Sequence, residues 1–103
     1  LPAPSAVPAP RKVSTLAFRR RFTLPERAAI EWAAVDRPDQ QDAQRMQAAA
    51  LRATLKDQEQ ARFIDLDDPD MESGVQTLES MGLLQPGRAE QILGAPVQTG
   101  ELP

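Results

Sequence analysis

The densest group of carboxylates in the sequence lies between residues 65 and 72. It consists of Asp65, Asp67, Asp68, Asp70 and Glu72. Carboxylate oxygens are the ligands that hard cations such as Ca²⁺ prefer, but a calcium loop starting at Asp65 would need glycine and glutamate at its sixth and twelfth positions. Asp70 and Gln76 stand there instead. The pattern therefore favours helix capping and a solvent-facing acidic surface over a metal site.

The residues that other catalytic chemistry needs are also missing. The sequence contains no His and no Cys, which excludes imidazole-based triads, thiol nucleophiles, disulfides and the usual zinc sites. The paired carboxylates fall on one short turn without aromatic walls for a cleft, so glycosidase-type acid–base chemistry is not expected. No glycine-rich phosphate loop is present. We expect no enzyme activity, no catalytic residue and no cofactor.

Charge is strongly segregated along the chain. Residues 11–27 hold six basic residues and one acid, whereas residues 57–72 hold seven acids and one arginine. Contact between adjacent protein subunits and internal pairing within one chain explain the two segments equally well. Phosphate binding is less favoured, because the net charge is −3 and no DNA-binding signature follows. In the first interpretation, the charged rims of an interface are Arg19, Arg20, Arg21, Asp65, Asp67, Asp68 and Asp70.

The chain is long enough for one small domain. It has 103 residues, of which 41% are hydrophobic but only 4% aromatic. A core built mainly from Ala, Leu, Ile, Val and Met is thin, and a domain of this size often depends on a partner. The sequence contains no stretch of about 18 apolar residues, so no membrane span is predicted. The start of the sequence contains no apolar run of roughly 7–15 residues, so no signal peptide is predicted.

The two ends are expected to be extended. Residues 1–12 open with LPAPSAVPAP, in which four of ten residues are proline, and proline favours a polyproline-like arm. This arm is either a linker or a segment laid along a neighbouring subunit. Residues 97–103 show no periodicity and are expected to form a tail. The helical domain is therefore placed at residues 13–96.

Helix signals begin at residue 13. Residues 13–22 fit a strand or a short helix, and we favour the helix because Ser14 would cap it and two phenylalanines would stack four residues apart. The letters TLPE at residues 23–26 form a capping box, which predicts the start of a second helix. The letters DRP at residues 36–38 predict its end, since the residue before proline resists the α conformation.

A third, long helix is expected over residues 39–62, with Asp39 as its N-cap. The segment is rich in residues of high helix propensity. Its apolar residues form two faces that point in nearly opposite directions, namely Ala43, Met46, Ala50 and Ala53 on one and Ala48, Leu51 and Leu55 on the other. Either the domain covers both faces or a second subunit covers one of them. Leu51, Leu55 and Trp32 are our candidate partner contacts.

The first helix of a C-terminal hairpin is predicted to start near Pro69. Asp67 or Asp68 would cap it, and Asp70 would suit its positive end. Gly82 would end it in the left-handed conformation, with Leu83 packed on Leu78 as in a Schellman motif.

The second helix of this hairpin is predicted to start at Pro86 and to end at Gly94 and Pro96. Two short helices joined by a glycine-containing turn complete the hairpin at residues 69–94. The predicted fold class is therefore all-α, a small bundle of four to five short helices ending in a helical hairpin.

Two strings of the sequence resemble small proteins encoded among the tail and tail-fibre genes of tailed bacteriophages. They are FRRRFTLPERAAIEWAA and FIDLDDPDMESGVQTLESMGLLQPGRAEQILGAPV, with residues 63–94 the most specific part. The resemblance covers residues 13–97. It implies a minor virion component or a tail-assembly factor, and it carries over no catalytic residue.

These observations predict a structural subunit that binds other proteins, namely a minor component of a phage tail, tail fibre or baseplate. Its partners would be other subunits of the same assembly, homo-oligomeric contacts included, with no membrane and no small-molecule substrate. It would reside in the host cytoplasm before assembly and in the virion afterwards. The first alternative is a transient chaperone of tail or tail-fibre assembly, and the second is a small regulator that binds nucleic acid.

Overall fold

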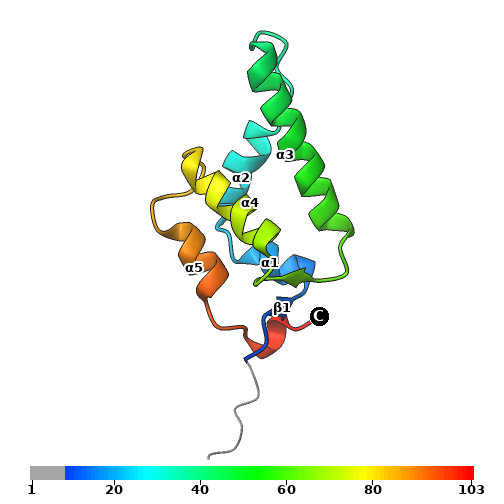
Figure 1. Cartoon of the computed structure of the whole chain (residues 1–103), viewed down its shortest axis with the longest axis vertical. Coiled ribbons are helices and arrows are strands. Elements are labelled where there is room, and N and C mark those ends of the chain that lie inside the picture. Colours follow the sequence, from blue (N-terminus) through cyan, green and yellow to red (C-terminus); the bar gives the residue numbers. More distant parts are fainter. Residues whose placement is uncertain (1–8) are drawn as a thin grey trace, which may run out of the picture.

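The computed structural model describes residues 9–103 and contains five α-helices in that range (Figure 1). The helices are α1 (Thr15–Arg20), α2 (Leu24–Ala33), α3 (Asp42–Gln60), α4 (Pro69–Ser80) and α5 (Arg88–Gly94). Two short strands, β1 (Lys12–Val13) and β2 (Ile64–Asp65), and a 3₁₀ turn, η1 (Thr99–Glu101), complete the described elements. The predicted small helical bundle is confirmed. The proline-rich part of the expected arm, residues 1–8, lies outside the described residues.

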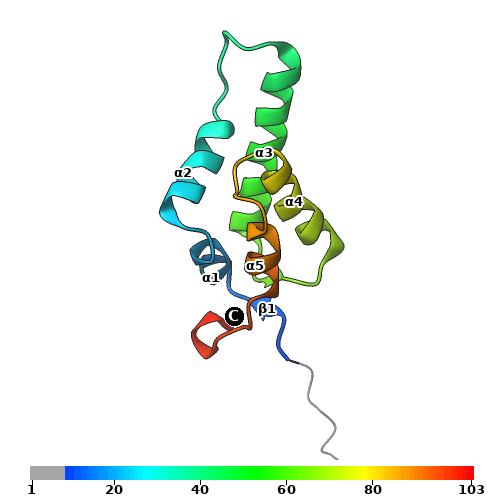
Figure 2. The same ribbon diagram turned by 90° about the vertical axis from the view of Figure 1, so that its left-hand side faces the viewer.

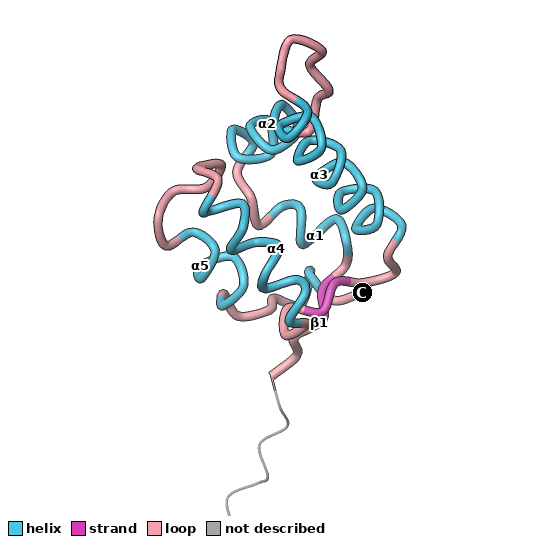
Figure 3. Tube along the Cα trace, turned by 45° about the horizontal axis from the view of Figure 1, so that its top comes forward, coloured by secondary structure: helices cyan, strands magenta, loops and turns pink. Residues whose placement is uncertain are grey.

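The helices form two hairpins around the short α1. Helices α2 and α3 run in opposite directions and meet at the loop at one end of the molecule, while α4 and α5 form the second hairpin beside them (Figures 1 and 2). The strands β1 and β2 pair antiparallel, with Lys12 opposite Asp65 and Val13 opposite Ile64 (Figure 3). This ladder ties the segment before α1 to the segment before α4.

The core lies where α1, α4, α5 and the two strands meet. Its most deeply buried large side chains are Val13, Phe18, Leu66, Val75 and Ile92. The long α3 buries only Ala48 fully, and its leucines are partly exposed. The α2–α3 hairpin is therefore joined to the rest of the molecule by a thinner apolar contact than the α4–α5 hairpin.

The local signals at the start of the domain are confirmed, but α1 is shorter than the predicted helix over residues 13–22, because Val13 belongs to β1 and α1 ends at Arg20. The Ser14 side chain accepts a hydrogen bond from the Ala17 amide, so residues 15–20 form a helix and not the alternative strand. The rings of Phe18 and Phe22 meet edge to face with centroids 5.3 Å apart. Thr23 forms the predicted capping box at the start of α2.

The start of α3 differs from the prediction. The helix begins at Asp42 with Gln41 as its N-cap, and Asp39 lies in the preceding turn. The Gln40 amide donates to the carbonyl of Arg37 at 3.0 Å. Residues 37–40 therefore form a separate turn, and the helix cannot begin at Asp39. At the other end the helix stops at Gln60, two residues before the expected boundary.

The α4–α5 hairpin follows the sequence prediction at its first turn. Asp68 caps α4, and Gly82 has a φ of 80°. The amides of Gly82 and Leu83 donate to the carbonyls of Glu79 and Leu78, both at 3.0 Å. These two bonds are the Schellman pattern, and they satisfy carbonyls that the helix end leaves free.

Helix α5 begins two residues after the predicted start at Pro86. Pro86 lies in the connecting turn, and Gly87, with a φ of 88°, is the N-cap of a helix that begins at Arg88. A left-handed residue at this place reverses the chain direction, which only glycine does without strain. Gly94 is the last residue of α5, as expected.

The segment 97–103 is not an extended tail. It contains η1, and the Ser14 amide donates to the carbonyl of Glu101 at 2.8 Å. Val97 packs against the core. Arg11 and Lys12, which we assigned to the arm, also belong to the folded domain. The backbone carbonyl of Arg11 accepts a hydrogen bond from the Leu66 amide, and Lys12 lies in β1. The folded domain therefore extends beyond the predicted range of residues 13–96 at both ends.

Candidate functional site

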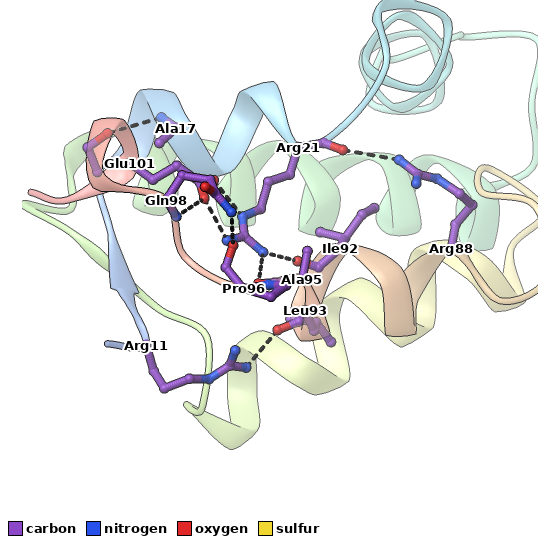
Figure 4. Close-up of polar contacts among 11 residues, drawn as sticks. Arg11, Ala17, Arg21, Arg88, Ile92, Leu93, Ala95, Pro96, Gln98 and Glu101 are labelled. Atoms are coloured by element: carbon purple, nitrogen blue, oxygen red, sulfur yellow. Dashed lines mark hydrogen bonds and ion pairs between the residues drawn. The ribbon is translucent and has the colours of Figure 1, made fainter. Parts of the chain in front are cut away.

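The three consecutive arginines 19–21 have different roles. The Arg21 side chain is only 7% exposed and forms a two-pronged ion pair with Glu101, with nitrogen–oxygen distances of 2.8 and 3.0 Å. It also donates to the carbonyls of Ile92 and Ala95 (Figure 4). Arg21 is therefore an internal residue and not the interface rim that we expected, whereas Arg19 and Arg20 are exposed.

The acidic segment is also used locally. The carboxylates of Asp65 and Asp68 accept the amides of Asp67 and Asp70, each at 3.0 Å, which confirms the capping interpretation. Asp67 also pairs with Arg11 at 2.9 Å. This ion pair joins the basic segment to the acidic segment within one chain, as the internal-pairing interpretation expects. No group of three or more potential metal ligands occurs within residues 9–103.

A second arginine joins α5 to the start of α2. Arg88 donates to both carboxylate oxygens of Glu26, at 2.8 and 2.9 Å, and to the carbonyl of Arg21. The hydrogen bonds from Arg88 lower the pKa of Glu26 to about 2, against the opposing effect of burial. Glu101 also has a lowered pKa, because Arg21 donates to its carboxylate. These groups have structural partners and none is an exposed acid or base.

The structure separates the apolar candidates. Leu51 and Leu55 are partly buried and pack against the core, and Leu51 also lines the groove described below. The opposite face of α3 is exposed, with Met46 at 69%. Trp32 is 64% exposed, as a partner contact requires, and the Arg37 guanidinium stacks 3.8 Å from its ring centroid.

An apolar groove of about 500 Å³ lies between helices α1, α2, α3 and α4. It arises because α2 and α3 contact each other closely near their shared loop, where Arg52 donates to the carbonyl of Ala34 and Arg45 pairs with Asp36. Away from this loop the helices are farther apart (Figure 1). The apolar lining comes from Phe18, Phe22, Ile30, Leu51, Val75 and Leu78.

Small side chains border this groove on two helices. They are Ala50 and Thr54 on α3 and Ser73, Gly74 and Thr77 on α4. A Cβ added at Gly74 would meet no atom within 4 Å. The space beside this glycine is therefore open, and a partner backbone can approach α4 closely there.

Charged residues of α2 line the same groove. Glu31 is 3.7 Å from Arg19, and both side chains are well exposed. Arg27 forms no ion pair within residues 9–103, and its buried Nε has no hydrogen-bond partner there. A buried donor without a partner is costly.

The groove suits the binding of apolar side chains. Its large apolar side chains lie among polar and charged residues of all four helices, and an apolar surface that carries some polar groups is typical of a binding site. Arg27 and Gly74 were not among the predicted site residues. The available signal was Gly74 itself, a residue of low helix propensity in the middle of a predicted helix.

Comparisons with protein-family models, curated proteins and solved structures find no match to this chain. Within residues 9–103, no helix combines the length and apolar character needed to cross a membrane.

Proposed function

We propose that this chain is a protein-binding subunit of a larger assembly and that its groove receives apolar side chains of a partner. The observation that carries this proposal is the groove of about 500 Å³ between α1, α2, α3 and α4. Water against its apolar lining is unfavourable, so covering this surface releases free energy.

The exposed apolar residues beside the groove support the same proposal. Trp32 and Met81 are both large, exposed side chains, and Met81 also lines the groove. Aromatic residues and methionine are enriched at protein interfaces. The thin core is consistent with a domain that gains stability from a partner.

For the assembly itself we propose a phage tail, tail fibre or baseplate, in which this chain is a minor component. The resemblance of residues 13–97 to small proteins of phage tail gene regions is the support for this part. The protein would then reside in the virion after assembly.

Quantitative mass spectrometry of purified phage particles from the source of the sequence tests this assignment. A structural subunit is present at fixed stoichiometry through successive purification steps. Absence from finished particles, together with failed tail assembly when the gene is deleted, would contradict it and identify an assembly chaperone instead.

A groove-filling variant tests the role of the groove. Gly74→Leu adds a side chain that extends into the groove and raises helix propensity, so we expect a folded protein that no longer enters particles. Gly74→Ala is the matched control, because it raises helix propensity without filling the space. Equal incorporation of both variants would contradict the proposed use of the groove.

A further inference from the structure

We infer that the proline-rich segment at the start of one copy, residues 1–10, binds a hollow beside Trp32 on a second copy. This Trp32 hollow has a volume of about 340 Å³ and lies between the second half of α2, the start of α3 and the turn after α4. It borders the groove at Gln47 and Met81, which line both, whereas Trp32 lines only the hollow. The inference therefore adds a second contact site to the proposed function and names a second copy of this chain as its partner.

The Trp32 hollow presents an exposed aromatic ring in a fixed position. Trp32 is 64% exposed, and the Arg37 guanidinium stacks on its ring while donating to the Trp32 carbonyl at 3.0 Å. Arg37 thus holds the indole in place, and Met81 and Leu83 supply further apolar surface. Surfaces with exposed aromatic rings are the ones that bind proline-rich segments.

Side-chain amides surround this ring. They belong to Gln40, Gln44 and Gln47. The Gln44 side-chain oxygen accepts the Gln41 amide, so its NH₂ group is left to donate elsewhere. A polyproline segment makes no internal hydrogen bonds, and its backbone carbonyls accept from their surroundings instead. The hollow therefore combines an aromatic ring with donors that suit such a segment.

The first ten residues carry a matching apolar face. Four of the ten are proline, which favours the polyproline conformation with three residues per turn. In that conformation the residues at every third position share one face, namely Leu1, Pro4, Val7 and Pro10. This face would hold the only leucine and the only valine of the segment, which has no charged side chain. Residues 1–8 lie outside the described residues, and Pro10 is exposed.

The reach of the segment favours a second copy over its own chain. The segment joins the domain at β1, which pairs with β2 just after the end of α3, whereas the hollow lies at the other end of α3 beside the α2–α3 loop (Figure 1). Helix α3 extends about 24 Å from Gln44 to Gln60. Ten residues in the polyproline conformation span roughly 31 Å, so within one chain most of that length would be used to reach the hollow. The segment of a second copy can lie along the hollow with its whole apolar face.

Light scattering of the full chain, from about 1 µM to about 1 mM, tests the inference. Each copy can give a segment and receive one, so we expect the mass to rise with concentration to at least twice 11.3 kDa. Trp32 is the only tryptophan, and its emission should shift to shorter wavelength over the same range as its ring loses water. A monomer throughout would overturn the inference. A Trp32 emission that does not change with concentration would also overturn it, because the hollow would then be empty or filled by its own chain.

Two neighbouring substitutions test the apolar face of the segment. Val7→Asp places a charge on that face, whereas Ala6→Asp places the same charge on a different face and is the matched control. We expect Val7→Asp to weaken association at least about tenfold and Ala6→Asp to change it much less. Equal effects of the two substitutions would contradict the proposed face.

A mixing experiment tests the direction of the contact. Val7→Asp retains an intact hollow and Trp32→Ser retains an intact segment, so neither variant should associate alone. An equal mixture should form a complex of two chains and no larger species, because only one productive contact is possible. The remaining tryptophan belongs to the chain with the intact hollow, and its emission should shift on mixing. A mixture that stays monomeric would overturn the inference.

Leu16→Ser is the matched control for Trp32→Ser, because it removes an exposed apolar side chain of α1. We expect it to associate like the unchanged protein, while circular dichroism shows equal helix content in both variants. Association that survives Trp32→Ser uses another surface and would contradict the role of the hollow. The particle and Gly74 experiments test the proposed function separately, because they measure incorporation and not self-association.

Discussion

An arginine takes part in every ion pair within residues 9–103, and Arg21 is the most enclosed of these arginines. Its guanidinium joins α1 to the C-terminal turn through Glu101 and to the end of α5 through two backbone carbonyls. Arginine suits this place because its planar fork donates in several fixed directions at once and stays charged.

Arg21→Gln should lower the free energy of unfolding by about 3–5 kcal/mol, because it leaves the part-buried Glu101 carboxylate and two carbonyls without their donor. Chemical denaturation monitored by circular dichroism measures the change. Arg20→Gln is the control at an exposed position, where we expect a change within about 0.5 kcal/mol. Equal effects at the two positions would contradict the internal role of Arg21.

Glu26 makes stability depend on pH in the acid range. Hydrogen bonds from Arg88 lower its pKa in the folded state to about 2, from an ordinary value of 4.5. Because the folded-state pKa is the lower one, the contribution is complete above pH 4.5 and is lost as the pH falls towards 2.

Glu26→Gln should therefore destabilise the protein by about 1–3 kcal/mol at neutral pH. The difference between the two proteins should shrink as the pH is lowered from 4.5 to 2. Urea unfolding at a series of pH values measures this convergence. A constant difference across the series would show that the Glu26–Arg88 pair is not its cause.

At the level of the helices, a glycine within α4 and a glycine just after its end have opposite effects on stability. Gly82 has positive φ and closes the Schellman motif, whereas Gly74 lies within the helix with open space beside it. A glycine at positive φ avoids strain, while a glycine inside a helix costs conformational entropy.

Gly82→Val should destabilise the domain by about 1–3 kcal/mol, because a β-branched side chain resists positive φ even where space is available. Gly74→Ala should stabilise it by about 0.4–1 kcal/mol, since the unfolded chain loses freedom and the helix gains propensity. Thermal unfolding of both variants checks the signs. An unchanged melting temperature for Gly82→Val would contradict the importance of the left-handed end.

At the level of the whole molecule, the segment after α5 closes the fold. The carbonyl of Glu101 accepts the Ser14 amide and its carboxylate binds Arg21, so the last residues contact the first helix. Within residues 9–103, the segment around Ser14 and the segment around Glu101 are therefore adjacent in space.

Deletion of residues 97–103 should lower the free energy of unfolding. Its effect should not be additive with the effect of Arg21→Gln. Both changes remove the same ion pair, so a double-mutant cycle should give a coupling energy of about 0.5–3 kcal/mol. Denaturant unfolding of the four proteins supplies the cycle. Simple additivity would mean that the two ends contribute independently.

The sequence by itself determined the local elements, because their signals lie within a few residues of each other. Ser14, the Thr23 capping box, the Asp68 cap and Gly82 each satisfy or end a helix through neighbouring backbone groups. The long-range partners of Arg21 could not be predicted, since nothing in a run of three arginines distinguishes the buried one.

Only the tertiary structure decided which apolar face of α3 is buried and that a groove exists. Periodicity shows that a helix has apolar faces, but the angle between packed helices decides which face another element covers. The separation of α2 and α3 away from their loop leaves the groove open, with Phe22, Ile30 and Leu78 in its lining. That angle depends on contacts among residues far apart in the chain, which a single sequence does not contain.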